Sequence, residues 1–360
     1  MPTTTILEDL YRYNDWANDR IFALCRSLTD AQLDEPREMG FGSLRNTLFH
    51  ILAAEEIWFE RWNGDPWRPF QANADGLPIV DIATRLHQVS ERRQEMFERK
   101  RTGGWRRIVQ YKDGKGREFN VVLGDLALHV ANHGIHHRAQ ALSFLKSFGQ
   151  TVPGGLDYIF YRFARPFIKQ ESSAVEALRQ WGLDVETGSG DAVSWDGDVI
   201  QDYFAYGDWS NDRVLSLAIT LDDATLDRSW SIGMDSIRKT ALHIADAERW
   251  WIRNWTVGPS EFERAPETTS LSQLREEWQR LIEQRNSFIS GVDAHSAQRV
   301  ITAMTPGPTL RVPLIESFVQ LCGHGTHHRA QLINMLRHSG VTVPPVDLGL
   351  WVRERTVVGV

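Results

Sequence analysis

The sequence predicts an all-α protein made of two tandem four-helix bundles, with a short β-hairpin in a loop. Two observations carry this prediction: long segments with apolar residues at helical spacing, and an internal repeat that spans most of the chain. The 360 residues are 42% hydrophobic and 24% charged, which is typical of a globular protein. Each copy of the repeat is long enough to form a domain, so we expect a duplicated domain rather than a solenoid.

The repeat is visible in four pairs of segments that keep their order along the chain. They are YNDWANDR (13–20) with YGDWSNDR (206–213), 42–62 with 235–255, NHGIHHRAQ (132–140) with GHGTHHRAQ (323–331), and GQTVP (149–153) with GVTVP (340–344). From these pairs we expect a first bundle over 1–165, a linker over 166–196 and a second bundle over 197–360. The expected linker contains a short helical run, SSAVEALRQWG, followed by the loop-like sequence ETGSGD.

Within each copy, apolar residues that recur every three or four positions predict long helices. Ser43 and Ser236 each precede such a run, where a hydroxyl can accept from free N–H groups of the first turn. Gly149 and Gly340 stand where a helix is expected to end. Alternation around a Lys-Asp-Gly turn over 106–123 predicts the hairpin. The other predicted helices cover 5–27, 79–100, 122–147, 197–219, 269–290 and 313–338.

Composition excludes several classes of protein. No apolar run reaches the length of a membrane-spanning helix, and the first residues lack the features of a secretory signal, so we expect a cytoplasmic protein with no membrane partner. A net charge of -7 argues against a broad nucleic-acid-binding surface. The two cysteines, Cys25 and Cys322, are too few for a disulfide scaffold or a cysteine-rich metal site.

Histidines are the residues that most need an explanation, because three of them recur in register in each copy. In the first copy, His133 and His137 have the i, i+4 spacing that places two rings on one face of a helix, and His50 lies on a different helix. Three imidazoles with open positions beside them would suit zinc, nickel or ferrous iron. The alternative is a set of hydrogen-bonded core histidines. The matching residues of the second copy are His243, His324 and His328.

Two further histidines complicate this assignment. His136 and His327 also recur, and the spacing alone leaves an i, i+3 pair open as the ligand pair. His129 is replaced by Gln320 in the second copy, so we do not expect it to be essential. The duplicated tryptophans are expected in the bundle cores rather than around a ligand: Trp16, Trp58, Trp62, Trp209, Trp251 and Trp255.

Two pairs of charged residues are candidates for catalysis or binding. Glu55 and Glu248 lie on the core-facing stripe, five residues after a candidate ligand, where a carboxylate could be a general base or a partner of a ligand histidine. The alternative is a buried ion pair with the duplicated arginine of the first helix, Arg20 or Arg213. Arg138 and Arg329 follow the last histidine and are candidates for binding an anionic substrate group or, alternatively, for contacting carbonyls between helices.

These residues resemble those of the DinB family, the YfiT-like metal-binding bundles. In the first half the resemblance rests on YNDWANDR, LFHILAAEEIWFERW and NHGIHHRAQ…TVPGGLDYIFY, and in the second on YGDWSNDR, LHIADAERWW and GHGTHHRAQ…TVPPVDL. It implies a right-handed up-down-down-up bundle that binds one divalent metal ion per repeat. Carried over by position, the implied ligands are the i+4 sets: His50, His133 and His137 in one repeat, and His243, His324 and His328 in the other.

The resemblance also implies a function. Characterised relatives include S-transferases that use low-molecular-weight thiols, so we expect a metal-dependent enzyme of this type that acts on a small electrophile, with a metal-bound thiolate as the nucleophile. The alternatives are a non-catalytic, stress-linked metal-binding or scaffold protein, and a metal-dependent hydrolase with Glu55 or Glu248 as the base. Because the family is usually dimeric, we expect the tandem chain to form an intramolecular pseudo-dimer.

Overall fold

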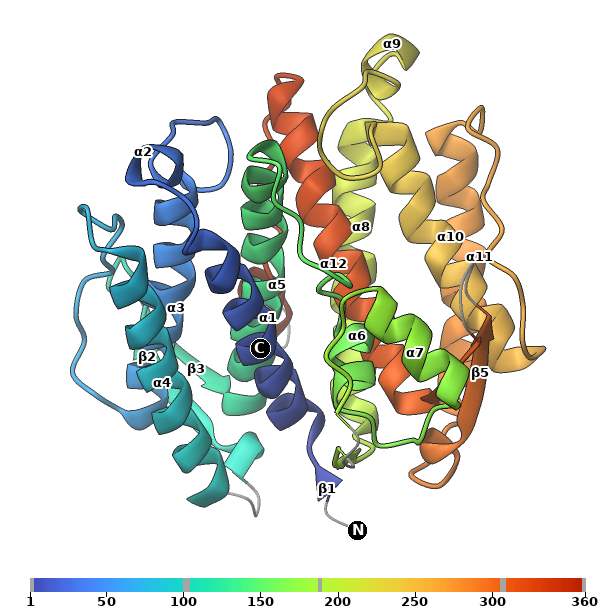
Figure 1. Ribbon diagram of the computed structural model, residues 1–360, viewed down its shortest axis with the longest axis horizontal. Helices are drawn as coiled ribbons and strands as arrows, with labels where there is room; N and C mark the ends of the chain where they lie inside the picture. Colours follow the sequence, from blue (N-terminus) through green and yellow to red (C-terminus); the bar gives the residue numbers. More distant parts are fainter. Residues whose placement is uncertain (1–2, 100–103, 187–189, 305–308, 358–360) are drawn as a thin grey trace. The chain divides into compact units, whose positions relative to one another are not determined.

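The computed structural model describes residues 3–99, 104–186, 190–304 and 309–357, and most of them are helical (Figure 1). The elements in chain order are β1 (Thr3–Thr4), α1 (Ile6–Cys25), α2 (Asp30–Leu33), α3 (Leu44–Asn63), α4 (Ile79–Arg99), η1 (Gly104–Arg106), β2 (Ile108–Lys112), β3 (Glu118–Val122), α5 (Leu123–Ser147), α6 (Tyr158–Ala164), α7 (Ser172–Gln180), β4 (Ala192–Val193), α8 (Gly197–Ala218), α9 (Asp223–Leu226), α10 (Ile237–Thr256), α11 (Leu271–Ser290), η2 (Ser296–Gln298), β5 (Val300–Met304), β6 (Thr309–Pro313), α12 (Leu314–His338) and α13 (Leu348–Val357).

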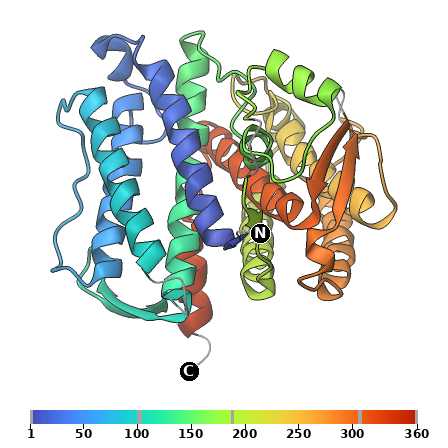
Figure 2. The same ribbon diagram turned by 60° about the horizontal axis from the view of Figure 1, so that its bottom comes forward.

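The predicted fold class is confirmed. Helices α1, α3, α4 and α5 run side by side as bundle 1, and α8, α10, α11 and α12 do so as bundle 2 (Figures 1 and 2). The predicted hairpin is present as the antiparallel pair β2–β3. A second hairpin, β5–β6, occupies the equivalent place in bundle 2 and was not predicted from the sequence. Each hairpin leads directly into the helix that carries two of the candidate metal ligands.

The helix ends follow the signals in the sequence. The hydroxyls of Ser43 and Ser236 accept hydrogen bonds from the backbone N–H three residues on, at the start of α3 and α10. Gly149 and Gly340 follow the last turns of α5 and α12 with φ of 72° and 81°. This left-handed conformation favours glycine and lets the backbone turn away from the helix.

Large aromatic side chains fill the core of each bundle. In bundle 1, Trp62 is 1% exposed, and the Tyr11 ring stands edge-on to it with centroids 6.0 Å apart. In bundle 2, Trp255 meets Phe318 edge to face at 4.7 Å. Burial of these rings provides the main driving force for folding. Among the described residues, no helix is both long and apolar enough to cross a membrane.

The chain forms two compact units, and each unit contains chain from both repeats. The unit around bundle 1 consists of Leu10–Thr151 and the residues from Pro345 onward, including α13. The unit around bundle 2 consists of the residues up to Asp9 and of Val152–Pro344, so it includes β1, α6 and α7. The predicted domain boundaries follow the sequence repeat rather than these compact units. They stay a prediction: 1–165, 166–196 and 197–360. The short helix expected in the linker is present as α7, whereas residues 187–189 of ETGSGD lie outside the described residues.

A buried ion cluster fixes α6 within the bundle 2 unit. Arg162 of α6 is 2% exposed and donates to Asp9 at 2.9 Å and to Glu316 of α12 at 2.6 Å. Tyr158 donates to the same Asp9 carboxylate at 2.6 Å. Buried charges are tolerated only when they are paired, so the cluster specifies where α6 lies along α12. This placement determines the position of Asp157, the residue just before α6.

Candidate metal centres

Bundle 1 brings His50 of α3 together with His133 and His137 of α5. The Nε2 atoms of His50 and His133 are 3.0 Å apart. The His137 ring centroid lies 4.6 Å from that of His50 and 4.3 Å from that of His133. One ligand atom from each ring lies within 4.8 Å of the other two. The two α5 rings converge because an i, i+4 spacing places side chains one turn apart on the same helix face.

Bundle 2 repeats this arrangement with His243 of α10 and with His324 and His328 of α12. The Nε2 atoms of His243 and His324 are 3.1 Å apart. The ring centroid of His328 lies 4.6 Å from that of His243 and 4.4 Å from that of His324. The two triads therefore agree in geometry to within a few tenths of an ångström.

The donors and their spacing fit a divalent transition metal. Zinc–imidazole bonds of about 2.0–2.1 Å in a tetrahedral arrangement place neighbouring nitrogens roughly 3.3 Å apart, close to the separations of 3.0 and 3.1 Å. Imidazole must be neutral to bind a metal. Burial lowers the pKa of His50 and of His243 to about 3, so both rings are neutral at pH 7. Three nitrogen ligands also leave coordination positions for water or substrate.

A glutamine fixes the orientation of the last histidine in each triad. The Nδ1 atom of His137 lies 2.8 Å from Oε1 of Gln140, and that of His328 lies 2.7 Å from Oε1 of Gln331. Because an amide oxygen only accepts, Nδ1 carries the proton and Nε2 keeps its lone pair for a metal. Both glutamines stand in the repeated HHRAQ motif, so their recurrence was a signal that the sequence analysis did not use.

The same glutamines also contact the adjacent repeated histidines. The amide nitrogens of Gln140 and Gln331 lie 3.3 Å from Nε2 of His136 and 3.0 Å from Nε2 of His327, respectively. These two histidines therefore contact the orienting glutamines, whereas the candidate ligand clusters contain the i+4 histidines. The choice of the i, i+4 histidines as metal ligands stays a prediction.

In bundle 2 a carboxylate also orients the middle histidine. Oδ2 of Asp157 lies 3.0 Å from Nδ1 of His324 and accepts from Nε2 of Gln320 at 2.9 Å. Oε1 of Gln320 in turn accepts from the backbone N–H of Ile159 at 2.9 Å. Burial alone would raise the pKa of Asp157, but the hydrogen bond with His324 lowers it, so the carboxylate is ionised. A carboxylate on the far nitrogen of a ligand histidine fixes its tautomer and raises its basicity.

The corresponding position in bundle 1 is built differently. His129 replaces Gln320, and its Nδ1 accepts from the backbone N–H of Gly349 at 3.0 Å. Asp347, the counterpart of Asp157, is 3.9 Å from His129 Nδ1, which is beyond hydrogen-bond distance. His129 is buried and has a defined role in the hydrogen bonding of this unit. The two triads therefore have equivalent ligands and different surroundings.

Glu55 and Glu248 are buried in ion pairs within the bundles. Glu55 is 4% exposed, is paired with Arg93 of α4 and accepts from Asn14 at 2.6 Å. Glu248 is paired with Arg285 of α11. Burial raises the pKa of Glu55, and Arg93 opposes that rise. The buried ion pair foreseen as an alternative is thus present, but its cation comes from α4 or α11 rather than from the first helix of the repeat.

Arg138 and Arg329 are also buried among helix side chains. Arg138 is 2% exposed and donates to Asn18 at 3.1 Å. Arg329 is 3% exposed and donates to Asn211 at 2.8 Å. Each guanidinium joins the first helix of its bundle to the helix that carries two histidines. This geometry is that of a core hydrogen bond between helices.

Comparison with known proteins agrees with the duplicated architecture. The DinB family profile matches residues 1–172 and 196–355. Protein DinB of Bacillus subtilis (strain 168) is 24% identical over 159 residues, which cover 43% of this chain and 92% of that protein. The relative thus corresponds in length to one repeat, and the two matched segments are the two copies. The chain belongs to the DinB family, with two tandem family domains in one polypeptide.

Proposed function

We propose that each triad binds one divalent transition-metal ion and that the protein is a metal-dependent enzyme of the thiol S-transferase type. The observation that carries the metal proposal is the convergence of three histidine nitrogens in each bundle, at separations that match a shared ion. A bound ion would act as a Lewis acid that lowers the pKa of a coordinated thiol. Zinc, nickel and ferrous iron all suit three imidazole ligands.

The residues around the bundle 2 triad support the catalytic part of this proposal. Gln331 and Asp157 hold His328 and His324 through their Nδ1 atoms, which keeps both Nε2 atoms directed inward. Fixed ligand geometry leaves the remaining coordination positions open in a constant direction. A small thiol and an electrophile would then meet in a defined orientation.

A purely structural metal is a second candidate function, and one observation favours it for bundle 1. The ring of Phe41 stacks on His50 with centroids 3.6 Å apart and lies 5.4 Å from His137. An aromatic ring at this distance shields the triad from a ligand. We therefore assign the proposed thiol transfer to bundle 2 and regard the bundle 1 metal as a candidate for stabilising the fold.

The hydrolase alternative receives less support from the charged residues. A general base must lie within hydrogen-bond distance of the group whose proton it removes. Glu55 and Glu248 are instead buried against Arg93 and Arg285. We propose that these carboxylates, like Arg138 and Arg329, stabilise the bundles.

The location and assembly of the chain are part of the same proposal. A cytoplasmic location fits a thiol-dependent enzyme because thiols are kept reduced there. Each compact unit contains chain from both repeats, which supports an intramolecular pseudo-dimer.

Elemental analysis of the full-length protein, purified with zinc, nickel or iron in the medium, tests the metal proposal. We expect two ions per chain, one ion in His137→Ala or His328→Ala, and none in the double variant. His87→Ala is the matched control because the His87 side chain is 70% exposed and lies outside both triads. A wild-type protein that binds no metal would refute the proposal. Thiol transfer to a model electrophile should be lost in His328→Ala and retained in His137→Ala.

A further inference from the structure

The bundle 2 triad lies at the end of an apolar pocket that the proposed chemistry does not by itself explain. The pocket has a volume of about 280 Å³, and His243 and His324 are part of its wall. Six of the thirteen other residues that line it are aromatic and come from four different parts of the bundle 2 unit: Phe160, Phe163, Trp181, Trp250, Trp251 and Phe262. In another protein, an engineered apolar cavity of about 150 Å³ binds benzene, so this pocket has room for a substituted ring.

The polar groups of the pocket are gathered near the triad. Asp157 and Gln320 line it, but they are hydrogen-bonded to each other, and Asp157 is also hydrogen-bonded to His324. Among the described residues that line the pocket there is no lysine or arginine. The wall therefore offers no cation to a carboxylate or phosphate, and it favours an uncharged apolar group.

At the equivalent place in bundle 1, two larger residues stand among the described residues. Tyr111 pairs with Phe119 across the β2–β3 hairpin, where Ala303 pairs with Leu310 across β5–β6. The Tyr111 ring packs against Phe119 at 5.5 Å and against Trp58 at 5.0 Å. Trp58 is the repeat counterpart of the pocket residue Trp251. Replacing alanine by tyrosine thus converts an open apolar space into a packed aromatic cluster.

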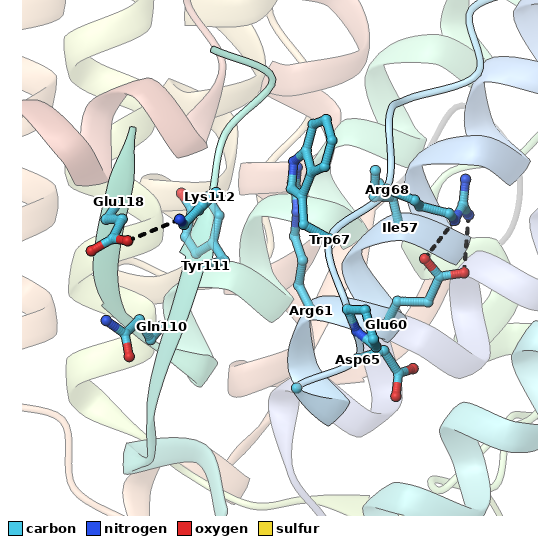
Figure 3. Close-up of a pocket in the computed structure, with 12 residues that line it drawn as sticks. Ile57, Glu60, Arg61, Asp65, Trp67, Arg68, Gln110, Tyr111, Lys112 and Glu118 are labelled. Carbon is cyan, nitrogen blue, oxygen red and sulfur yellow. Dashed lines mark hydrogen bonds and ion pairs between the residues drawn. The ribbon is translucent and has the colours of Figure 1, made fainter. Parts of the chain in front are cut away.

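A cavity of similar size in bundle 1 is of another chemical kind. Its volume is about 340 Å³, and its lining contains neither His50 nor the other ligands of that triad. Figure 3 shows a Lys112–Glu118 ion pair on one side and an Arg68–Glu60 ion pair on the other, with Arg61 between them. An apolar ring would gain little from such charged walls. The apolar pocket beside a triad is therefore a feature of bundle 2.

We infer that the bundle 2 centre takes a small molecule with an uncharged aromatic group, which occupies this pocket while a second group of the molecule ligates the metal. This inference rests on the proposed function, since it assumes a metal at His243, His324 and His328. It adds the class of substrate and assigns Ala303 as a residue that determines specificity.

The test compares two thiols that differ only in the pocket-filling group, phenylmethanethiol and ethanethiol. Cobalt(II)-loaded full-length protein reports thiolate binding through its visible spectrum, without any turnover. His50→Ala isolates the bundle 2 centre and His243→Ala isolates the bundle 1 centre. Because burial of a phenyl ring contributes on the order of 1.5–3 kcal/mol, phenylmethanethiol should bind the bundle 2 centre at least about tenfold more tightly than ethanethiol does. The bundle 1 centre, which Phe41 shields, should bind both thiols more weakly and with a much smaller preference.

A variant with a larger side chain in the pocket tests whether the pocket causes the preference. In the His50→Ala background, Ala303→Tyr introduces the bundle 1 residue and should abolish the preference for phenylmethanethiol, and the cobalt content of the variant shows whether its metal centre is intact. Leu310→Phe is a second filling variant in case Ala303→Tyr fails to fold. Equal preferences at both centres, or a preference that survives both filling variants, would overturn the inference and leave metal binding intact. Absence of cobalt, or of any thiolate spectrum at both centres, would instead count against the proposed function.

Discussion

Removal of the Asp157 carboxylate should weaken metal binding at bundle 2 and leave bundle 1 unaffected. Loss of an acceptor behind a ligand histidine typically costs about 10- to 100-fold in metal affinity. Oδ2 of Asp157 serves both His324 and Gln320, but the Asp157 side chain is 25% exposed, so water can replace part of the lost interaction. We therefore expect about a tenfold loss for Asp157→Ala, which is about 1.4 kcal/mol. Asp157→Asn retains an acceptor oxygen and should lose less.

The assay is competition for zinc with a coloured chelator in single-centre backgrounds. Asp157→Ala is measured in His50→Ala protein, where the bundle 2 triad is intact. The matched control is Asp347→Ala in His243→Ala protein, because Asp347 lies 3.9 Å from His129 and does not bond to a triad histidine. That control should change affinity by less than about threefold. The cobalt spectrum should shift in Asp157→Ala, which a general loss of stability would not produce. An unchanged affinity in Asp157→Ala, or equal losses at both centres, would refute this reasoning.

Three further predictions concern stability and assembly. Burial holds the pKa of His50 and His243 at about 3, below an unfolded value of about 6.5, so the unfolded chain binds more protons. The free energy of unfolding of metal-free protein should fall as pH is lowered from about 6.5 towards 5. In the variant with both His50→Gln and His243→Gln, urea denaturation should show a free energy of unfolding that depends less on pH. Arg93→Met leaves the buried Glu55 carboxylate without its ion-pair partner and should lower the free energy of unfolding, measured by urea denaturation, by about 3–5 kcal/mol. Adding Glu55→Leu should restore most of this loss. Analytical ultracentrifugation should give the mass of one chain, and a dimer of full-length chains would contradict the pseudo-dimer.

The helices were predictable because their signals are local. Apolar periodicity and the caps at Ser43 and Ser236 fixed the long helices to within about two residues, within the ordinary uncertainty of helix ends. The β5–β6 hairpin was missed because its connecting sequence, TPGP, contains two prolines and lacks the Asp-Gly pair that marks the turn of the first hairpin. The first hairpin, at the same place in the repeat, was the available signal.

No local signal in the sequence shows that each compact unit contains segments of both repeats. The ion cluster that fixes α6 joins Arg162 to Asp9 and Glu316, which are each about 150 residues away along the chain. Helical periodicity shows which face of α6 is apolar but not which helix covers it. For this reason Asp157, although its repeat counterpart Asp347 is visible in the sequence, could not be connected with His324 before the fold was known.

Duplication made the candidate ligands easier to find than their surroundings. A repeated spacing identifies His50 and His133 with either His136 or His137 as a candidate set without knowledge of the fold, and the family resemblance favours His137. The same spacing places Glu55 on the inner face of its helix, yet it cannot show that α4 supplies Arg93 to that carboxylate. Spacing along one helix defines a direction, whereas the charge that meets a side chain comes from another element.

The differences between the repeats fall around the triads rather than in them. The three ligands and the orienting glutamine are identical in both copies, while Ala303 stands in place of Tyr111 and Gln320 in place of His129. Changes at the candidate ligand positions would abolish metal binding, whereas changes at these surrounding positions alter the affinity for the metal or the molecules that reach it. Two copies that both hold an ion, of which one admits an apolar ligand, would diverge in this pattern. Random drift in one unused copy would instead be expected to change the histidines as readily as the residues around them, because a lost histidine there carries no cost.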